Sequence, residues 1–171
     1  MKKYWFIAAG VFLTLLAATC IFPCVRCVSF TNRKNHKERV FSCSALKGFV
    51  ISYTHSVNKG RVHDFYRCDA DTLVLCKTEF VSYGAGIPEP EETPGAVFTV
   101  TDNNYVISGI NRVVPKLVMA VGLVARHAIT FDESFSVGQN EFYLTDFFEP
   151  QTSIIFEYKK VSLVDYLLHS L

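Results

Sequence analysis

The chain has 171 residues, half of them hydrophobic, and a formal net charge of +1. A charge this close to zero argues against a nucleic-acid-binding protein, which normally carries a clear basic excess. Once the apolar N-terminus is set aside, the remainder fits one domain, and its richness in Val, Phe and Tyr favours strands over helices.

Residues 1–28 begin with Met and two lysines and continue with an apolar run that starts at Tyr4 and that only two threonines interrupt. About 20 apolar residues are enough to cross a bilayer as a helix, and Tyr4 and Trp5 suit the headgroup level. We therefore expect residues 1–28 to form one N-terminal transmembrane anchor. A cleaved signal peptide is the alternative, although this run is longer than a usual signal core and residues 17–20 match a cleavage site poorly.

The orientation of this anchor depends on the cations that flank it. Lys2 and Lys3 favour a cytoplasmic N-terminus, which places the domain outside the cytoplasm. Five cations follow the apolar run within residues 26–39, and counting them literally reverses that orientation. We predict an extracytoplasmic domain, either held by the anchor or exported after cleavage, and the family resemblance given below contributes to this choice.

Three of the six cysteines lie at this end of the chain, and Cys24 and Cys27 form a C-x-x-C pair. Such a pair can be redox-active or can supply half of a metal site. A zinc site needs a second pair of ligands at a suitable spacing, and only His36 is near. We therefore interpret the pair as small apolar residues at the end of the helix and expect no metal and no cofactor.

The rest of the chain is expected to be all-β. Residues 29–46 form a predicted basic linker, residues 47–161 a β domain, and residues 162–171 a short C-terminal helix or tail. About eight or nine short strands with turn signals between them are typical of an antiparallel sandwich or barrel. The predicted strands are residues 49–54, 62–68, 72–80, 96–101, 105–108, 113–121, 125–131, 141–145 and 153–161.

No catalytic signature is complete in this sequence: G-x-S-x-G, the P-loop and H-E-x-x-H are all missing. A triad of Ser56, His127 and Glu79 can be imagined. However, the adjacency of His55 and Ser56 does not make a nucleophile, because neighbouring residues of a strand point to opposite faces. The sequence therefore favours a non-enzymatic protein.

Three groups of residues remain as candidates for a binding site. His55 and Ser56, followed by Lys59, end a strand, where a histidine can titrate, hold a carboxylate or simply bond a loop carbonyl. Glu79 precedes Gly84 and Gly86, whose backbone could form an anion-binding nest or only a bend. Arg112 and His127 each lie beside a strand-like run and have a structural role as their alternative.

Three stretches of the sequence resemble the motifs of a known family: YTHSVNKGRVHDFYR, LVLCKTEFVSYGAGIPE and GINRVVPKLVMAVGLVARHAITF. In order and spacing they resemble a bacterial and archaeal family of unknown function. Its pattern is His-Ser-Val-Glu-Lys, then aromatic-Gly-Ala-Gly-hydrophobic-Pro, then an Arg and a His. The resemblance covers residues 48–161. Asn58 departs from it by replacing the usual acid, and Gly60-Arg61 by replacing Thr-Pro, which puts any role of that acid in doubt here.

The resemblance also implies a context. Members of that family typically carry an N-terminal hydrophobic segment, and their genes often lie beside those of TAXI-type TRAP transporters. These transporters take up organic anions with an extracytoplasmic binding protein and a membrane permease. The positions that fall on the family motifs are His55, Ser56, Lys59, Glu79, Gly84, Gly86, Arg112 and His127.

We therefore expect a membrane-anchored extracytoplasmic β domain that is an accessory or interaction module of a TAXI-type TRAP transporter. Its expected partners are the membrane, through the N-terminal helix, and the permease or the binding protein. The alternative function is that of an organic-anion-binding protein or an enzyme. In that case His55, Lys59 and Arg112 should converge on a carboxylate.

Overall fold

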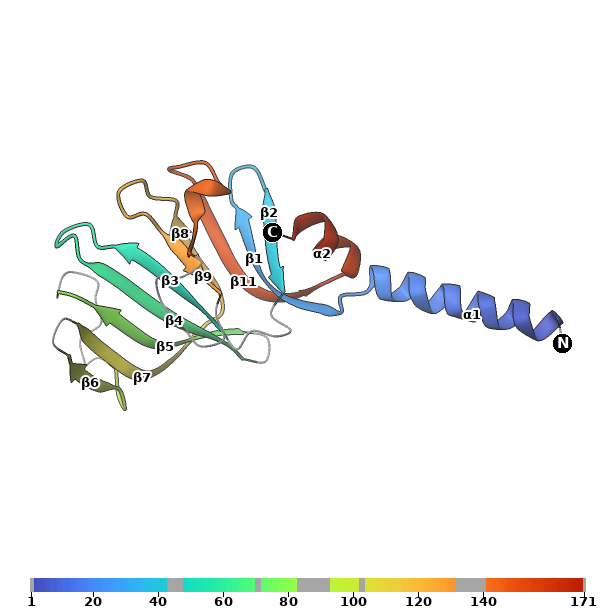
Figure 1. Cartoon of the computed structure of the whole chain (residues 1–171), viewed down its shortest axis with the longest axis horizontal. Coiled ribbons are helices and arrows are strands. Elements are labelled where there is room, and N and C mark those ends of the chain that lie inside the picture. The colour runs from blue at the N-terminus through green and yellow to red at the C-terminus, as the bar shows by residue number, and fades with distance from the viewer. Residues whose placement is uncertain are drawn as a thin grey trace.

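The computed structural model describes residues 2–42, 48–69, 72–82, 93–101, 104–131 and 141–170. An N-terminal helix, α1 (Lys2–Ile21), leads into a body of two antiparallel sheets, and Figure 1 shows the helix standing away from that body. The small sheet has the strand order β2-β1-β11-β8, and the large sheet has the order β10-β9-β3-β4-β5-β7-β6. This arrangement is sandwich-like, so the predicted all-β class is confirmed.

The strands of the small sheet are β1 (Val25–Asn32), β2 (Glu38–Ser42), β8 (Leu117–Ala120) and β11 (Ser153–Val161). Those of the large sheet are β3 (Gly48–Thr54), β4 (Arg61–Asp69), β5 (Thr72–Phe80), β6 (Val97–Val100), β7 (Tyr105–Val114), β9 (Ala128–Thr130) and β10 (Glu141–Tyr143). A 3-10 turn, η2 (Leu144–Asp146), follows β10, and the helix α2 (Leu163–His169) follows β11. The limits of β5 and β11 coincide with the predicted runs.

The segment predicted as a basic linker differs from the structure. Residues 25–42 form the hairpin of β1 and β2, in which β1 lies between β2 and β11. Phe30 pairs with Phe156 of β11 on one side and with Arg39 of β2 on the other. The polar residues that indicated a linker form the hairpin turn instead, where the Asn32 N–H donates to the Lys37 carbonyl at 2.9 Å.

The predicted strand over residues 113–121 is two strands in two sheets. β7 ends at Val114 in the large sheet, and β8 begins at Leu117 in the small one. Pro115 lies between them, and because proline has no N–H to give to a ladder it suits a break in strand pairing. The chain therefore turns a corner from one sheet to the other at this point.

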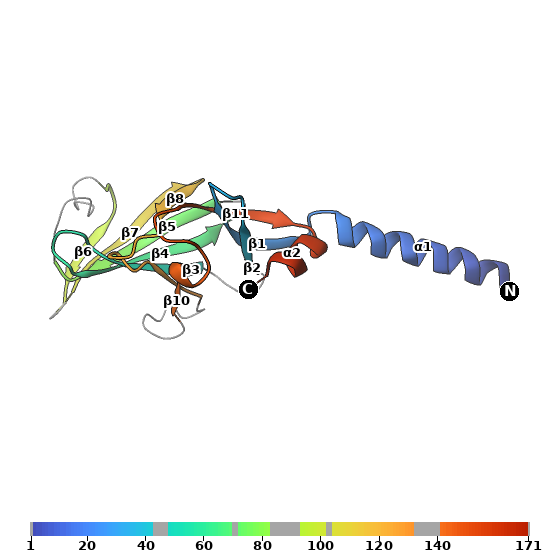
Figure 2. The ribbon, with the colours of Figure 1, turned by 90° about the horizontal axis from the view of Figure 1, so that it is seen from above.

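The hydrophobic core lies between the two sheets. Phe30 and Phe156 of the small sheet meet edge to face, with ring centroids 4.7 Å apart. Phe49 and Tyr66 of the large sheet stack at 5.4 Å, and all four side chains are buried. Figure 2 shows the body from above, with β1, β2 and α2 at the end next to α1 and β6 at the opposite end.

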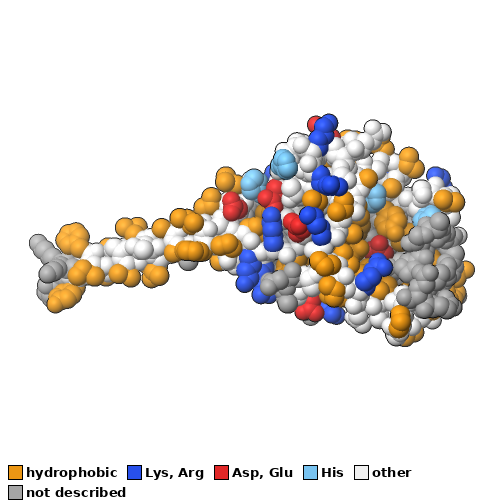
Figure 3. Space-filling model, turned by 180° about the vertical axis from the view of Figure 1, so that it is seen from behind, with side chains coloured by type: hydrophobic (Ala, Val, Ile, Leu, Met, Phe, Trp, Pro, Cys, Tyr) orange, Lys and Arg blue, Asp and Glu red, His pale blue; other side chains and the backbone are white. Residues whose placement is uncertain are grey.

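The helix α1 is apolar on all sides and exposed along its length. Its large hydrophobic side chains, from Tyr4 and Trp5 to Ile21, are 50–80% exposed. Figure 3 shows hydrophobic side chains along the helix, with acidic and basic side chains where it joins the body. Across the described ranges, no helix combines the length and the apolar character that crossing a membrane requires.

Candidate functional site

His55 caps the loop between β3 and β4. The residue is 7% exposed, and its Nδ1 accepts weak hydrogen bonds from the backbone N–H groups of Val57 (3.3 Å) and Asn58 (3.4 Å). Its own N–H donates to the Gly60 carbonyl at 2.8 Å, which closes the hairpin. These contacts of His55 are all with its own loop, and the binding role expected for this histidine stays a prediction.

Ser56 and Lys59 are exposed on the same loop. The Lys59 ammonium donates to the Ser56 carbonyl at 2.6 Å, and the Lys59 backbone has a positive φ of 59°. Asn58, which stands where the resembled family has an acid, has a backbone-binding role here. Its Oδ1 accepts from the Gly60 N–H at 2.9 Å, and its Nδ2 donates to the Ser82 carbonyl at 2.7 Å.

Arg112 lies far from His55. Arg112 of β7 pairs with Leu75 of β5, and Leu75 pairs with Tyr66 of β4. Tyr66 in turn pairs with Phe49 of β3, and Phe49 precedes His55 by six residues along the chain. At about 3.3 Å per residue, six residues correspond to roughly 20 Å along the strand. The cationic groups expected to converge on one carboxylate are therefore not together.

Glu79 and His127 are also separated from each other. Glu79 forms an ion pair with Lys77 at 2.7 Å and stands opposite His63 of β4. The His127 ring contacts the Tyr53 ring at 5.7 Å, on the inner face of the large sheet. Because Glu79 belongs to the outer face, the imagined triad does not form. Gly84 and Gly86 lie outside the described residues.

A row of polar side chains crosses the outer face of the large sheet. Ser52, His63 and Glu79 are paired in register on β3, β4 and β5, and Ser52 Oγ lies 2.8 Å from His63 Nδ1. Burial, together with the charge of Arg61, lowers the pKa of His63. Ser52 is fully buried, so its hydroxyl orients the imidazole and is not accessible to a substrate.

A second polar group, which the sequence reasoning missed, faces the interior. Asp64 is paired with Ile51 on one side and with Thr78 on the other, in a row that continues to Ile107. Directly paired residues share a face, and both isoleucines are in the core, so the carboxylate points inward. Asp64 Oδ1 accepts a 2.7 Å hydrogen bond from the Thr78 hydroxyl.

The interior setting changes the acidity of Asp64 and of two nearby tyrosines. Burial raises the pKa of Asp64 to about 6, although the Thr78 hydrogen bond and the charge of Arg112 both lower it. Burial and the Asp64 charge also raise the pKa of Tyr53 and of Tyr66, so both phenols keep their protons. We call Tyr53, Asp64, Tyr66 and Thr78 the inner polar cluster. It can take up or release a proton near pH 6, which makes it a candidate functional site.

One signal in the sequence could have located this cluster. Val62 and Asp64 are two residues apart on β4 and therefore share a face of the strand. The acid thus occupies a position whose neighbours on the same face are apolar. An acid at such a position is costly unless it is bonded or has a function. The strand pairing that brings Thr78 and Tyr53 beside Asp64 is not visible in the sequence.

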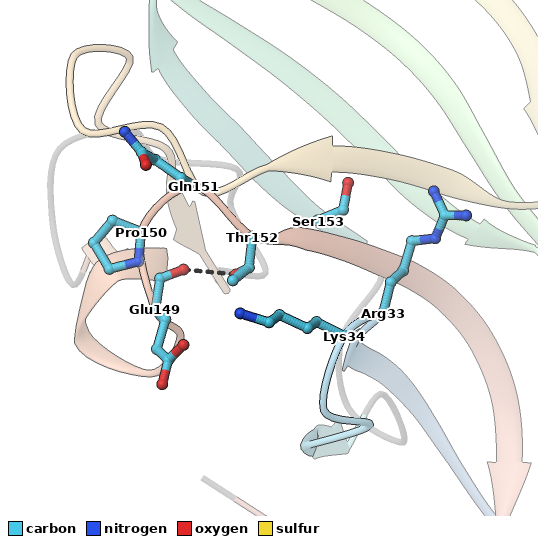
Figure 4. A pocket seen from close by; sticks show the side chains of 7 residues that line it. All are labelled: Arg33, Lys34, Glu149, Pro150, Gln151, Thr152 and Ser153. Carbon is cyan, nitrogen blue, oxygen red and sulfur yellow. Dashed lines mark hydrogen bonds between the residues drawn. The ribbon is translucent and has the colours of Figure 1, made fainter.

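An open pocket of about 470 Å³ lies where the β1–β2 turn meets residues 149–153 (Figure 4). Two buried side chains hold its walls together, since Asn32 Nδ2 donates to Thr152 Oγ1 at 3.1 Å and Thr152 Oγ1 donates to the Glu149 carbonyl at 2.6 Å. In Figure 4 Lys34 extends towards the Glu149–Thr152 segment. The lining residues are Arg33, Lys34, Glu149, Pro150, Gln151, Thr152 and Ser153.

Comparison with known proteins gives one match. Residues 49–137, slightly more than half of the chain, match the family described as "Domain of unknown function (DUF1850)". No curated protein and no solved structure matches the chain. The matched segment contains the whole inner polar cluster and every residue singled out on the family motifs, whereas the pocket of Figure 4 lies outside it.

Proposed function

The chain belongs to the family of the domain of unknown function DUF1850, and we propose that it is a membrane-tethered, extracytoplasmic β domain that serves as an interaction module of a TAXI-type TRAP transporter. The family description assigns no activity. The proposal therefore draws on the surfaces of this chain and on the resemblance of its motifs to proteins encoded beside such transporters.

The exposure of α1 is the observation that carries the tether. Val11, Phe12 and Leu13 are 55%, 66% and 62% exposed, and because consecutive residues of a helix are rotated by roughly 100°, they point to different sides of α1. A helix that is apolar all round has no side suited to water and is normally buried in protein or lipid. Each Å² of apolar surface withdrawn from water contributes roughly 25 cal/mol, so a lipid environment stabilises this helix. Tyr4 and Trp5 suit the headgroup region at the N-terminal end of α1, away from the β body.

A second apolar surface supports a protein partner. Val57, Val81, Leu123 and Val124, which we call the distal tip, are 42–73% exposed. They lie close together, because Asn58 bonds the Ser82 carbonyl and the Thr54 N–H donates to the Ala125 carbonyl at 2.7 Å. Figures 1 and 2 show the β3–β4 loop on the side of the body away from α1. Exposed apolar groups of this kind favour a protein contact, and their distance from the tether favours the binding protein over the permease.

The tether is tested by membrane fractionation of the full chain. We expect the chain to remain with membranes in alkaline carbonate and to be released by the double variant Phe12→Arg and Leu16→Arg. Phe12→Leu with Leu16→Ile is the matched control and should behave as the parent. A parent chain that is extracted by carbonate would refute the tether.

The partner is tested by photo-crosslinking in cells that carry the transporter. A photoreactive residue at Val57 should crosslink to the transporter's binding protein. The same residue at Val118, which is 45% exposed on the small sheet, is the control and should not crosslink. Crosslinking of neither the binding protein nor the permease from Val57 would reject the module assignment and leave the tether standing.

The extracytoplasmic placement is tested with Val57→Cys and a maleimide that does not cross membranes. Position 57 should be labelled in intact cells beyond the level of the parent chain. Labelling that appears only after permeabilisation would place the domain in the cytoplasm.

The pocket of Figure 4 favours a second function, the binding of a small organic anion. Arg33 and Lys34 line it together with Ser153, which gives two cations and a hydroxyl against the single carboxylate of Glu149. This site replaces the one expected around His55. Calorimetric titration with succinate should give saturable binding that is lost in Arg33→Gln with Lys34→Gln and kept in Lys116→Gln. Equal binding by both variants would exclude a site in this pocket.

A further inference from the structure

The base of the body, from which α1 leaves, has the features of a second lipid contact. We propose that this base binds the surface of an anionic membrane through an apolar stripe on α2 and a pair of cations on β1 and β11. The inference rests on the proposed tether and goes beyond it, because it specifies how the β body itself lies on the lipid and which headgroups it selects.

The stripe consists of Val164, Leu167 and Leu168, which are 45%, 67% and 68% exposed. Their spacing of three and four residues places them on one side of α2. Another side of the helix already covers the small sheet, where Tyr166 packs against a buried cluster that includes Cys27 and Val40. A surface helix normally has polar residues on its outer side, so the outward leucines of α2 call for an apolar environment of their own.

The cations are Arg26 and Lys160, which are directly paired on β1 and β11, and both are exposed. Like charges placed directly opposite each other in a sheet destabilise it. An anion bound between the two side chains removes that repulsion. A lipid phosphate has the charge for this position, and cationic side chains close to a negatively charged leaflet are attracted to it.

The stripe and the cations lie at the same end of the body as the tether. The Cys24 N–H donates to the Val161 carbonyl at 3.0 Å, which fixes the exit of α1 next to the end of β11. Helices α1 and α2 are in contact, and Phe22 between α1 and β1 is 67% exposed. Figure 2 shows α2 beside the base of α1, at the end of the body that faces the helix.

The combination of features identifies the occupant as lipid. Arg26 and Lys160 lie on the face of the small sheet opposite α2, because they alternate with Cys27 and Val161, which face the helix. Leucines and cations at one end of the body match a membrane surface, where apolar side chains enter the acyl boundary and cations remain at the phosphates. One acid, Asp165, is also exposed on α2. Its carboxylate accepts a 2.7 Å hydrogen bond from the Ser162 hydroxyl at the start of the helix, where negative charge is favourable.

The stripe is tested with single-tryptophan variants of the full chain. Trp5 is the one tryptophan of the sequence, so Trp5→Phe gives a dark background. In that background the fluorescence of Leu167→Trp should be quenched by lipids brominated in the acyl chain, and that of Val57→Trp at the distal tip should not. Leu168→Trp serves as a repeat on the same stripe in case Leu167→Trp folds poorly.

The outcomes separate this inference from the tether. If the chain floats with vesicles but the Leu167→Trp and Leu168→Trp variants are quenched no more than Val57→Trp, the inference is wrong and the tether stands. If the chain does not float with vesicles at all, the tether fails and the inference fails with it. The inference would also be overturned if a photoreactive residue at position 167 crosslinked to another protein in native membranes while lipid did not quench the fluorescence of Leu167→Trp.

The cations are tested by lipid composition. Quenching of the Leu167→Trp variant should be several-fold stronger in phosphatidylcholine vesicles that contain phosphatidylglycerol than in phosphatidylcholine alone. Adding Arg26→Gln with Lys160→Gln should abolish the difference, and adding Arg67→Gln with Lys116→Gln, which removes two exposed cations elsewhere, should preserve it. Equal quenching in both lipids, or an unchanged difference after the Arg26 and Lys160 substitutions, would contradict the selection of anionic headgroups.

Discussion

Ser52 and His63 face each other on neighbouring strands, with Ser52 Oγ 2.8 Å from His63 Nδ1. The contact looks like the start of a catalytic arrangement, since Glu79 follows in the same row. Because Ser52 has no exposed surface, the contact instead fixes the imidazole in a setting that disfavours its charged form. The row therefore influences stability through pH.

The lowered pKa of His63 predicts a loss of stability in acid. Unfolded histidine binds a proton below about pH 6.5, while burial and Arg61 keep folded His63 neutral to lower pH. The contribution of neutral His63 to the unfolding free energy is thus complete above about pH 6.5 and is lost as the pH falls. The NMR titration midpoint of His63 should lie below 6.5, and His63→Gln should lose less unfolding free energy than the parent between about pH 7 and pH 5. A midpoint above 6.5 would contradict this.

Asp64 has the opposite pH dependence. Its native pKa of about 6 exceeds the usual 3.8, so the folded state holds a proton that the unfolded state has released. Folding is penalised increasingly from about pH 4 to pH 6, and the penalty stays constant above that range. Asp64→Asn should stabilise the chain by about 1–2 kcal/mol at pH 8, a value reduced from the full shift because part of Asp64 remains accessible to solvent.

Urea unfolding at pH 8 and pH 4 checks this prediction. The advantage of Asp64→Asn should be much smaller at the lower pH. Asp69→Asn, at the exposed end of β4, is the control for removing a carboxylate from the surface. A destabilising effect of Asp64→Asn at pH 8 would mean that the ionised carboxylate is stabilised by its neighbours.

His127→Phe separates a structural role from a binding role. His127 Nδ1 is buried with no hydrogen-bond partner within the described part of the chain, and the ring lies 5.7 Å from that of Tyr53. Phenylalanine keeps the ring contact and removes an unsatisfied polar atom, so the unfolding free energy should stay unchanged or rise by about 1 kcal/mol. If stability is kept while crosslinking from the distal tip is lost, His127 has a role in binding.

Phe30→Ala should destabilise the body by about 3–5 kcal/mol, because it leaves a cavity in the core against Phe156. Val57→Ala, at the exposed tip, is the control and should change stability by less than about 0.5 kcal/mol. Denaturant unfolding of both variants gives the comparison. A small effect of Phe30→Ala would show that β1 is not a core strand.

Lys59→Gly tests whether this motif lysine is retained for its charge. Its φ of 59° is strained for lysine but acceptable for glycine, so stability should be unchanged or rise by about 1 kcal/mol. Asn58→Ala is the contrasting variant and should lose about 1–2 kcal/mol, because two backbone groups lose their bonds. A loss of crosslinking in Lys59→Gly at full stability would assign the ammonium to partner binding.

The sequence predicted strands correctly where the alternation of side chains between the two faces was strong. The runs over 72–80 and 153–161 correspond to β5 and β11 residue for residue. The hairpin of β1 and β2 was missed because its turn is rich in cations and directly follows an apolar helix, so both parts were assigned to other elements. Pro115 disfavours continued strand pairing, but it does not indicate that the chain changes sheets there.

The candidate site was harder to predict because it depends on pairing across strands. His55, Lys59 and Arg112 stand out in the sequence, but the register separates the first two from the third. Asp64 was overlooked, although the strands beside it supply Thr78 and Tyr53. Chemistry that comes from three strands at once becomes visible only when their relative registers are known.

The placement of β1 and β11 bears on how this protein can be dissected. The segment that matches the family starts in β3 and stops after β9, yet Phe30 and Phe156, which close one wall of the core, come from before and after it. An expression fragment trimmed to residues 49–137 would expose the apolar inner face of the large sheet to water, and such a fragment would tend to aggregate. A soluble truncation should start near Val25, behind the helix, and keep the chain through α2.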